Sequence, residues 1–263
     1  MTKTEKAQYK ILLGVITCQA SLVYMIFTGT MIAWAIAFFV YFLMFGLGVS
    51  LLNHRILSHK SVVVTSAITN HILLFFSTVM MQGSTLAWVG MHREHHAYSD
   101  TPKDPHSPSN VGFWASYWLS MMHTPNIRFV KDLLRDGRIQ QYHTHYWKIN
   151  FAYSAVLLLL FGPYGVIIGH LVPAAMTWHG VSIVNAVSHV DATFPTIIGY
   201  KNFETGDNSK NIPIAGYLTF GEGWHNNHHN DPSSVSFSTT WWEFDLIGII
   251  GKLINKANNK MNS

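Results

Sequence analysis

Residues 11–53 read ILLGVITCQASLVYMIFTGTMIAWAIAFFVYFLMFGLGVSLLN and contain no Asp, Glu, Lys or Arg. A helix that crosses a bilayer needs about 20 consecutive apolar residues, so this run is long enough for two. Thr28, Gly29 and Thr30 interrupt it, and we predict spans at residues 11–27 and 31–53 that form a hairpin with almost no loop. The run lacks a small-residue cleavage site and continues into a second span, so we do not expect a signal peptide.

A second uncharged run covers residues 149–190 and is broken at Gly162-Pro163. It predicts a second hairpin, with spans at residues 149–167 and 170–190. Residues 61–91 also lack charge but are more polar, and they predict an interfacial or re-entrant helix. The expected fold is therefore all-α: one integral-membrane domain of residues 1–263, with four transmembrane helices in two hairpins.

The distribution of basic residues predicts which side of the membrane the loops occupy. Only 11% of residues are charged, against about 25% in an average soluble domain. Of the 17 Lys and Arg residues, three precede the first span, nine lie between residues 55 and 148, and five follow residue 200. By the positive-inside rule, both termini and a cytosolic cap of residues 54–148 and 191–263 lie on the cytoplasmic side. This topology accounts for most of the net charge of +4, and we predict no nucleic-acid partner.

Three histidine clusters lie in the predicted cap: His54 with His59, then His92, His95 and His96, then His225, His228 and His229. In the second and third clusters, the spacing i, i+3, i+4 puts three imidazoles on one side of a helix. The first pair is separated by about 140° around a regular α-helix, so it converges only if the helix ends or distorts there. Asn185 and His189 form a further i, i+4 pair at the end of the last span.

These clusters predict two metal ions, because eight cluster histidines and His189 make nine imidazoles, more than one ion accepts. The single cysteine, Cys18, excludes a thiolate site. Nitrogen ligands suit iron, copper or zinc, but catalytic zinc normally uses three protein ligands. Soluble di-iron proteins use carboxylates, whereas only Glu94 and Glu222 lie in or beside these clusters. We therefore favour a histidine-ligated di-iron centre. Seven histidines fit no ligand spacing and are predicted to be structural: His71, His106, His123, His143, His145, His170 and His179.

The chain resembles the membrane fatty acid desaturases, in particular their Δ9, stearoyl-type branch. The resemblance rests on His54-Arg55 with Ser58-His59-Lys60-Ser61, His92 through Asp104-Pro105-His106, Asn185 to His189, Gly221 through His229, and Trp241-Trp242-Glu243-Phe244-Asp245. It extends from the second span nearly to the C-terminus. One departure concerns the segment near Ser236, where many bacterial relatives carry a basic residue and this chain does not.

The resemblance implies an O2-dependent enzyme that introduces a cis double bond at Δ9 into a saturated acyl chain linked to CoA, acyl carrier protein or lipid. It implies two iron ions bound by the nine histidines, with Asn185 approaching one through a water, and no other catalytic residue; zinc can replace iron in recombinant protein. The electrons are expected from a separate donor such as a ferredoxin or cytochrome, because the chain has no haem or iron-sulfur motif. A multi-pass protein of a bacterial-type cell membrane, surrounded by lipid, is the expected setting.

Two other functions fit parts of the pattern. A related hydroxylase or ketolase of alkanes, sterols or carotenoids would share the histidines and form a different product. A metal transporter would instead place its ionisable ligands near mid-membrane. The aromatic run before His54 is more typical of lipid-facing or helix-packing side chains. Phe42 nevertheless lies roughly 18 Å and Phe38 roughly 24 Å before His54 along an α-helix, so either ring is a candidate to close an acyl tunnel.

Overall fold

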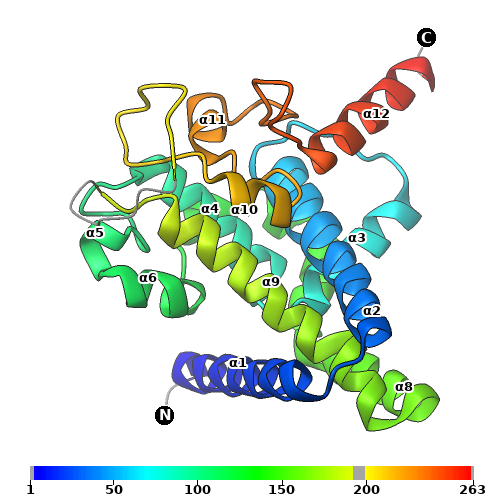
Figure 1. Cartoon of the computed structure of the whole chain (residues 1–263). Coiled ribbons are helices and arrows are strands. Elements are labelled where there is room, and N and C mark those ends of the chain that lie inside the picture. Colours follow the sequence, from blue (N-terminus) through cyan, green and yellow to red (C-terminus); the bar gives the residue numbers. More distant parts are fainter. Residues whose placement is uncertain (1–2, 192–198, 262–263) are drawn as a thin grey trace.

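The computed structural model describes residues 3–191 and 199–261, and within them the chain forms helices, turns and isolated bridges but no strand. The α-helices are α1 (Lys3–Thr28), α2 (Met31–Tyr41), α3 (Ala67–Val79), α4 (Thr85–Tyr98), α5 (Pro108–Val111), α6 (Phe113–Leu119), α7 (Gly137–Thr144), α8 (Tyr146–Val166), α9 (Val172–Ser182), α10 (Pro213–Leu218), α11 (His225–Asn230) and α12 (Leu246–Met261). Three π-helical segments continue α2, α8 and α9 in that order: η1 (Phe42–Ser58), η5 (Ile167–Leu171) and η6 (Ile183–Val187). Three short 3₁₀ helices lie in the described loops: η2 (Ser120–Met122), η3 (Ile127–Val130) and η4 (Leu133–Arg135). In Figure 1, α10, α11 and α12 lie at one end of the long helices α2 and α9, while α1 and α8 lie at the other.

Three helices of the described chain are long and apolar enough to cross a membrane: Gln8–Thr28, Met31–Ser58 and Tyr146–Val187. The third is 42 residues long, about twice what a bilayer requires. It bends where Gly162 adopts φ 69° and ψ −172°, a conformation that glycine tolerates, just before Pro163. The bend therefore lies several residues before the boundary at 167–170 that the sequence predicted.

The second membrane helix runs on to Ser58, past its predicted end at residue 53. From Phe42 onward its hydrogen bonds join residues i and i+5, as in the bond of 3.1 Å from the His59 amide to the His54 carbonyl. A π-helix of 17 residues is unusual, because most are single turns, often at functional sites. It brings the imidazoles of His54 and His59 to one side, with ring centroids 4.9 Å apart. This is the distortion that the i, i+5 spacing required.

The uncharged segment of residues 61–91, predicted as an interfacial or re-entrant helix, contains α3 and the first half of α4. Each begins at a serine, since the Ser66 hydroxyl accepts from the Thr69 amide and the Ser84 hydroxyl from the Ala87 amide. With 13 residues, α3 is too short to cross a bilayer on its own. It packs closely on η1, where a Cβ on Gly48 would lie 2.8 Å from the Ser77 nitrogen.

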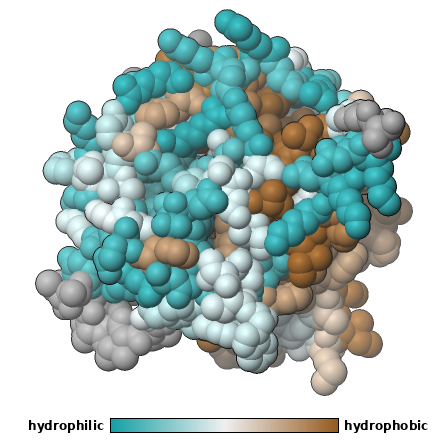
Figure 2. Space-filling view, turned by 90° about the horizontal axis from the view of Figure 1, so that it is seen from above, coloured by the Kyte–Doolittle hydropathy of each residue, from teal (hydrophilic) through white to brown (hydrophobic). Residues whose placement is uncertain are grey.

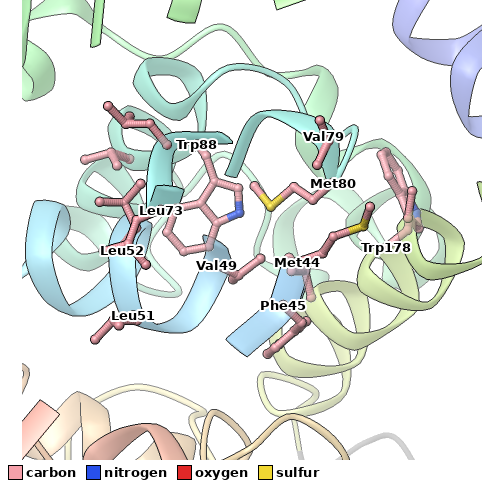
Figure 3. Close-up of a cluster of buried hydrophobic side chains, with 14 of the residues drawn as sticks. Met44, Phe45, Val49, Leu51, Leu52, Leu73, Val79, Met80, Trp88 and Trp178 are labelled. Carbon is pink, nitrogen blue, oxygen red and sulfur yellow. The ribbon is translucent and has the colours of Figure 1, made fainter. Parts of the chain in front are cut away.

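Buried apolar side chains join these helices beneath the histidine clusters. Figure 3 shows Met44, Phe45 and Val49 of η1 beside Met80, Trp88 and Trp178, which come from three different segments of the chain. The Trp88 ring is stacked on His92, with centroids 5.1 Å apart. The core therefore fixes η1 and α4 relative to each other, and both carry histidines.

The face above the clusters is mostly hydrophilic, and apolar residues come into view at one margin (Figure 2). By contrast, the long helices expose large apolar side chains such as Phe27, Ile32, Leu159 and Phe161. This division is the one expected of a membrane protein with a water-facing cap.

Candidate metal centre

The nine histidines singled out by spacing gather in two adjacent groups. Each group brings ligand nitrogens to within 4.8 Å of one another and could hold a metal ion. The first group contains His54, His59, His92, His96 and His228, and the second contains His95, His189, His225 and His229. The i, i+3, i+4 clusters thus divide between the groups: His95 and His225 face the second group, whereas His92 and His228 face the first. Each group is able to hold a metal ion.

The spacing of the ring nitrogens fits metal coordination. The Nε2 atoms lie 2.8 Å apart in His59 and His92, 3.0 Å in His54 and His228, and 3.0 Å in His189 and His225. Two nitrogens about 2.0–2.1 Å from one ion and at right angles are separated by roughly 2.9 Å. The Nε2 atoms of His95 and His229 are buried and have no hydrogen-bond partner, so their lone pairs are available to an ion.

Four imidazoles are oriented by carboxylates on their outer nitrogens. Nδ1 of His95 contacts Asp104 at 2.8 Å, Nδ1 of His189 contacts Asp100 at 2.8 Å, and Nδ1 of His229 contacts Asp207 at 2.6 Å. In the first group, Nδ1 of His54 contacts Glu222. A carboxylate that accepts from Nδ1 directs the Nε2 lone pair inward and raises its basicity, as in many metal sites.

The electrostatics keep these carboxylates ionised. Burial alone would raise the pKa of Asp104, but the hydrogen bond and charge of His95 hold it below the ordinary value. The pKa of Asp207 is lowered in the same way, because contacts with His229 and with nearby hydroxyls outweigh its burial. For Glu222, burial is opposed by His54 and Arg55, which bring the pKa to about 2.

Burial favours the neutral form of several of these imidazoles. Burial is the largest cause that lowers the pKa of His59, to about 2, and of His229, to about 3, and neighbouring imidazoles lower them further. The same causes lower the pKa of His92 and His96 well below its ordinary value. A neutral imidazole is the form that binds a metal.

A buried ion network supports the first group from behind. The Arg55 guanidinium bonds to Glu222 and lies 3.0 Å from Oδ2 of Asp245, and it stacks 3.9 Å from the ring centroid of Phe237. Arg55 has no exposed surface. Arg55, which follows His54 in the sequence, therefore holds the Glu222 carboxylate in place, and Glu222 in turn orients the His54 ring.

A small cavity of about 20 Å³ lies between the two groups and the membrane helices. It holds about one water, since a water needs roughly 10–15 Å³ of such volume. Its polar side is lined by Asn185, Glu222, His54, His92 and His225. Its remaining wall is largely apolar, with Phe45, Val49, Trp88, Val181 and Val184.

The two aromatic candidates for chain-length control lie on one face of α2 and η1. Phe42 is partly buried, and its ring meets Phe220 edge-on with centroids 5.1 Å apart. Phe38 is 45% exposed and 6.1 Å from the same ring. The segment from Phe42 to His54 is π-helical, so the α-helical rise behind the predicted 18 Å does not apply to it.

The other seven histidines make different contacts. His123 pairs with Glu94 at 3.0 Å, and His170 bonds to the Val79 carbonyl at 3.0 Å. His106 differs from these, since it is buried, stacks on His95 with centroids 4.4 Å apart, and forms a possible ligand group with His95 and Asp104. The rest contact structural partners: Tyr142 for His71, Ser84 for His143, the Gln141 carbonyl for His145, and Tyr117 with Gln19 for His179.

The orienting carboxylates were not singled out from the sequence. Asp100 and Asp104 follow the second cluster at short spacing, which is a usable signal for a carboxylate that contacts a ligand. Asp207 gives no such signal, because it reaches His229 from a loop 22 residues earlier in the chain.

Comparison with known proteins agrees with this site. The family described as fatty acid desaturase matches residues 28–248. The chain is 36% identical to the sn-1 stearoyl-lipid 9-desaturase of Anabaena variabilis, over 84% of this chain and 81% of that protein. It is also 36% identical to the protein of the same name from Synechocystis, over 85% and 69% of the two chains. A hex-5-enoyl-[acyl-carrier protein] acetylenase of Moorena producens is 30% identical over 76% and 67%. The match includes all nine histidines, and the chain belongs to the fatty acid desaturase family.

Proposed function

We propose that this desaturase introduces a Δ9 cis double bond into an acyl chain of a membrane lipid, using O2 and two iron ions held by the two histidine groups. The observation that carries the proposal is the pair of carboxylate-oriented histidine groups beside a partly apolar cavity. The names of the two 36% identical relatives support position 9 and a lipid-linked chain. His106 is not included among the ligands, because His95 already faces the second group.

Iron held by these histidines would supply the oxygen chemistry needed at an unactivated methylene, which no side chain can deprotonate. The protein's own side chains orient the metal ligands and keep water from the site of reaction. Asp100, Asp104, Asp207 and Glu222 hold the imidazoles, and Phe45, Val49 and Val184 exclude water from the carbon atoms that react. Asn185 faces the cavity and is suited to hold a water between its amide and one ion.

We also propose four membrane crossings, with the bend at Gly162 as the outer turn of the second hairpin. The cap and both termini then face the cytoplasm, where the basic residues are concentrated. An external ferredoxin or cytochrome would deliver electrons from that side.

The test is expression of the chain in a bacterial host that lacks its own desaturase, followed by gas chromatography and mass spectrometry of the lipid fatty acids. We expect monounsaturated chains with the double bond at carbon 9, and none with a His92→Ala variant. Hydroxylated or keto products would identify the alternative enzyme class, and a double bond elsewhere would contradict the Δ9 assignment alone.

A further inference from the structure

An apolar groove of about 270 Å³ lies between α2, the α9–η6 helix and α10, on the membrane side of the cap. Phe38, Met176, Ile183, Ile214 and Leu218 are among the residues that line it. Phe38, Ile214 and Leu218 are respectively 45%, 62% and 51% exposed. Large apolar side chains that are both exposed and grouped around a groove mark a binding surface.

The groove is separated from the cavity beneath the histidines by a single layer of side chains. Tyr41 lines the groove, and Phe45, one helical turn further along, lines the cavity. In the same way Gly180 lines the groove and the next residue, Val181, lines the cavity. The layer is tight, because a Cβ on Gly180 would lie 2.7 Å from the Phe45 ring and 3.0 Å from the Tyr41 hydroxyl.

Phe220 completes this layer. Its ring contacts Tyr41 and Phe45, with centroids 5.5 and 6.3 Å apart. Its backbone has φ 57°, a left-handed conformation that is costly for a bulky residue and occurs most often at functional sites. The Tyr41 hydroxyl donates to the Leu218 carbonyl at 2.9 Å, so the layer also ties α2 to the end of α10.

Exposed aromatic residues place the groove mouth at the membrane surface. Trp241 is 95% exposed, and Tyr217 is 51% exposed on α10, the same short helix that supplies Ile214 and Leu218. The Tyr217 hydroxyl donates to the Trp242 carbonyl at 2.6 Å, which joins the two segments. Tyr and Trp are enriched at the boundary between bilayer and water, where the ester groups of glycerolipids also lie.

We infer that the acyl chain of a membrane glycerolipid reaches the histidine groups sideways from the bilayer, through this groove and past the layer formed by Tyr41, Phe45, Gly180 and Phe220. This rests on the proposed acyl-lipid desaturase function. The occupant is a hydrocarbon chain still attached to its glycerol, because the groove is apolar, opens at the ester level, and ends one residue layer from the cavity. A side chain at position 180 would narrow this route, because a Cβ there would lie 2.7 Å from the Phe45 ring.

The test is photolabelling of the metal-loaded protein in phosphatidylglycerol vesicles that contain a trace of phosphatidylglycerol with a mid-chain diazirine at sn-1. Mass spectrometry maps the adducts. We expect enrichment in residues 176–183 and 213–218 over the exposed membrane-facing residues 156–161, and competition by unlabelled lipid. Equal labelling of all three segments would overturn the inference.

Two variants sharpen the result. Gly180→Ala, which narrows the route, and Ile214→Trp, which fills the mouth, should each lower adducts in residues 176–183 about tenfold or more, because an overpacked site excludes the chain. The matched controls are Gly169→Ala, whose Cβ would lie 3.1 Å from a Leu157 side chain, and Leu159→Trp, which is exposed on α8. Unchanged labelling in both groove variants would contradict the route.

Photolabelling requires no turnover, so it separates the two proposals. Adducts in the groove without any desaturated product would contradict the proposed function alone. Desaturated lipid without enrichment in the groove would contradict the sideways route alone. If Gly180→Ala slows conversion of a soluble acyl-carrier-protein thioester as much as that of lipid, the groove is not a lipid route.

Discussion

The Nε2 atoms of His54 and His228 lie 3.0 Å apart, although 174 residues separate the two histidines in the chain. His54 is fixed by the π-helix and by Glu222, and the His228 ring packs on Phe237 with centroids 4.4 Å apart. Both side chains are almost fully buried. Two lone pairs aimed at one point repel each other unless a cation or a proton lies between them, so the close pair is stable with a shared ion.

Removal of metal should therefore destabilise the protein. An ion present at 1,000 times its dissociation constant stabilises the folded state by roughly 4 kcal/mol. We expect a strong chelator to lower the melting temperature of the purified protein in detergent and re-added ferrous iron to restore it. A His228→Ala variant should show a smaller shift. A melting temperature that chelation leaves unchanged would count against a structural contribution of the ions.

Replacing Asp104 by Asn should weaken metal binding while preserving the fold. The amide oxygen can still accept from one of the two backbone amides, of Asp100 or of His106, that donate to separate oxygens of Asp104, but the side chain lacks the charge that supports His95. Loss of such an orienting carboxylate typically lowers affinity 10–100-fold. Metal content per chain, measured after dialysis against a graded chelator, reports this directly. Asp231→Asn is the control, because Asp231 bonds to Ser233 in its own loop; equal losses in the two variants would contradict the specific role of Asp104.

His189→Ala should abolish desaturation while the protein remains folded, because His189 belongs to the second histidine group. His123→Ala should keep most of the activity, since His123 forms a partly exposed pair with Glu94. Lipid unsaturation and size-exclusion profiles of both variants check this. A similar loss in both would mean that ligands and structural histidines have been divided wrongly.

Arg55→Met should be strongly destabilising. It leaves Glu222 and Asp245 buried without their cation, and breaking a buried pair in this way costs about 3–5 kcal/mol. Arg138→Met is the matched control, because Arg138 pairs with Asp136 at the surface and should change stability by about 1 kcal/mol or less. Thermal unfolding in detergent compares the two, and equal melting temperatures would refute the importance of the buried network.

Phe42→Ala should lengthen the acyl chain that is preferred without moving the double bond. Removing the ring that meets Phe220 opens space on the membrane side of the histidines, whereas the metal ligands stay in place. Phe38→Ala should have a smaller effect, because Phe38 lies at the half-exposed groove surface. Product profiles from cells fed saturated chains of graded length test both, and profiles identical to wild type would show that neither ring limits the chain.

Much of the site could be predicted from sequence because its signals are local. His92, His95 and His96 need only helical periodicity to share a face, and long uncharged runs can only be membrane helices or core. The bend at Gly162 was likewise visible as a Gly-Pro pair, although the predicted span boundaries were placed after it.

Features that depend on tertiary contacts were not predictable in the same way. The π-helical form of residues 42–58, which pack on α3 and α4, was not predicted, and only its consequence at His54 and His59 was anticipated. The contact between Asp207 and His229 depends on the path of a loop, and a loop has no periodic sequence pattern from which that path could be predicted. The buried contact of His106 with His95 has the same origin.

In the π-helix at Phe42–Ser58, thermal stability and activity favour different backbone conformations of the same segment. An α-helical register has better backbone geometry, yet it would rotate His59 about 140° from His54 and dismantle the first group. Substitutions that improve helix propensity here, such as Gly46→Ala, would favour the inactive register. Selection for thermal stability should therefore leave the sequence of this segment unchanged. Laboratory evolution toward a more stable enzyme should instead accumulate substitutions in α1 and α8.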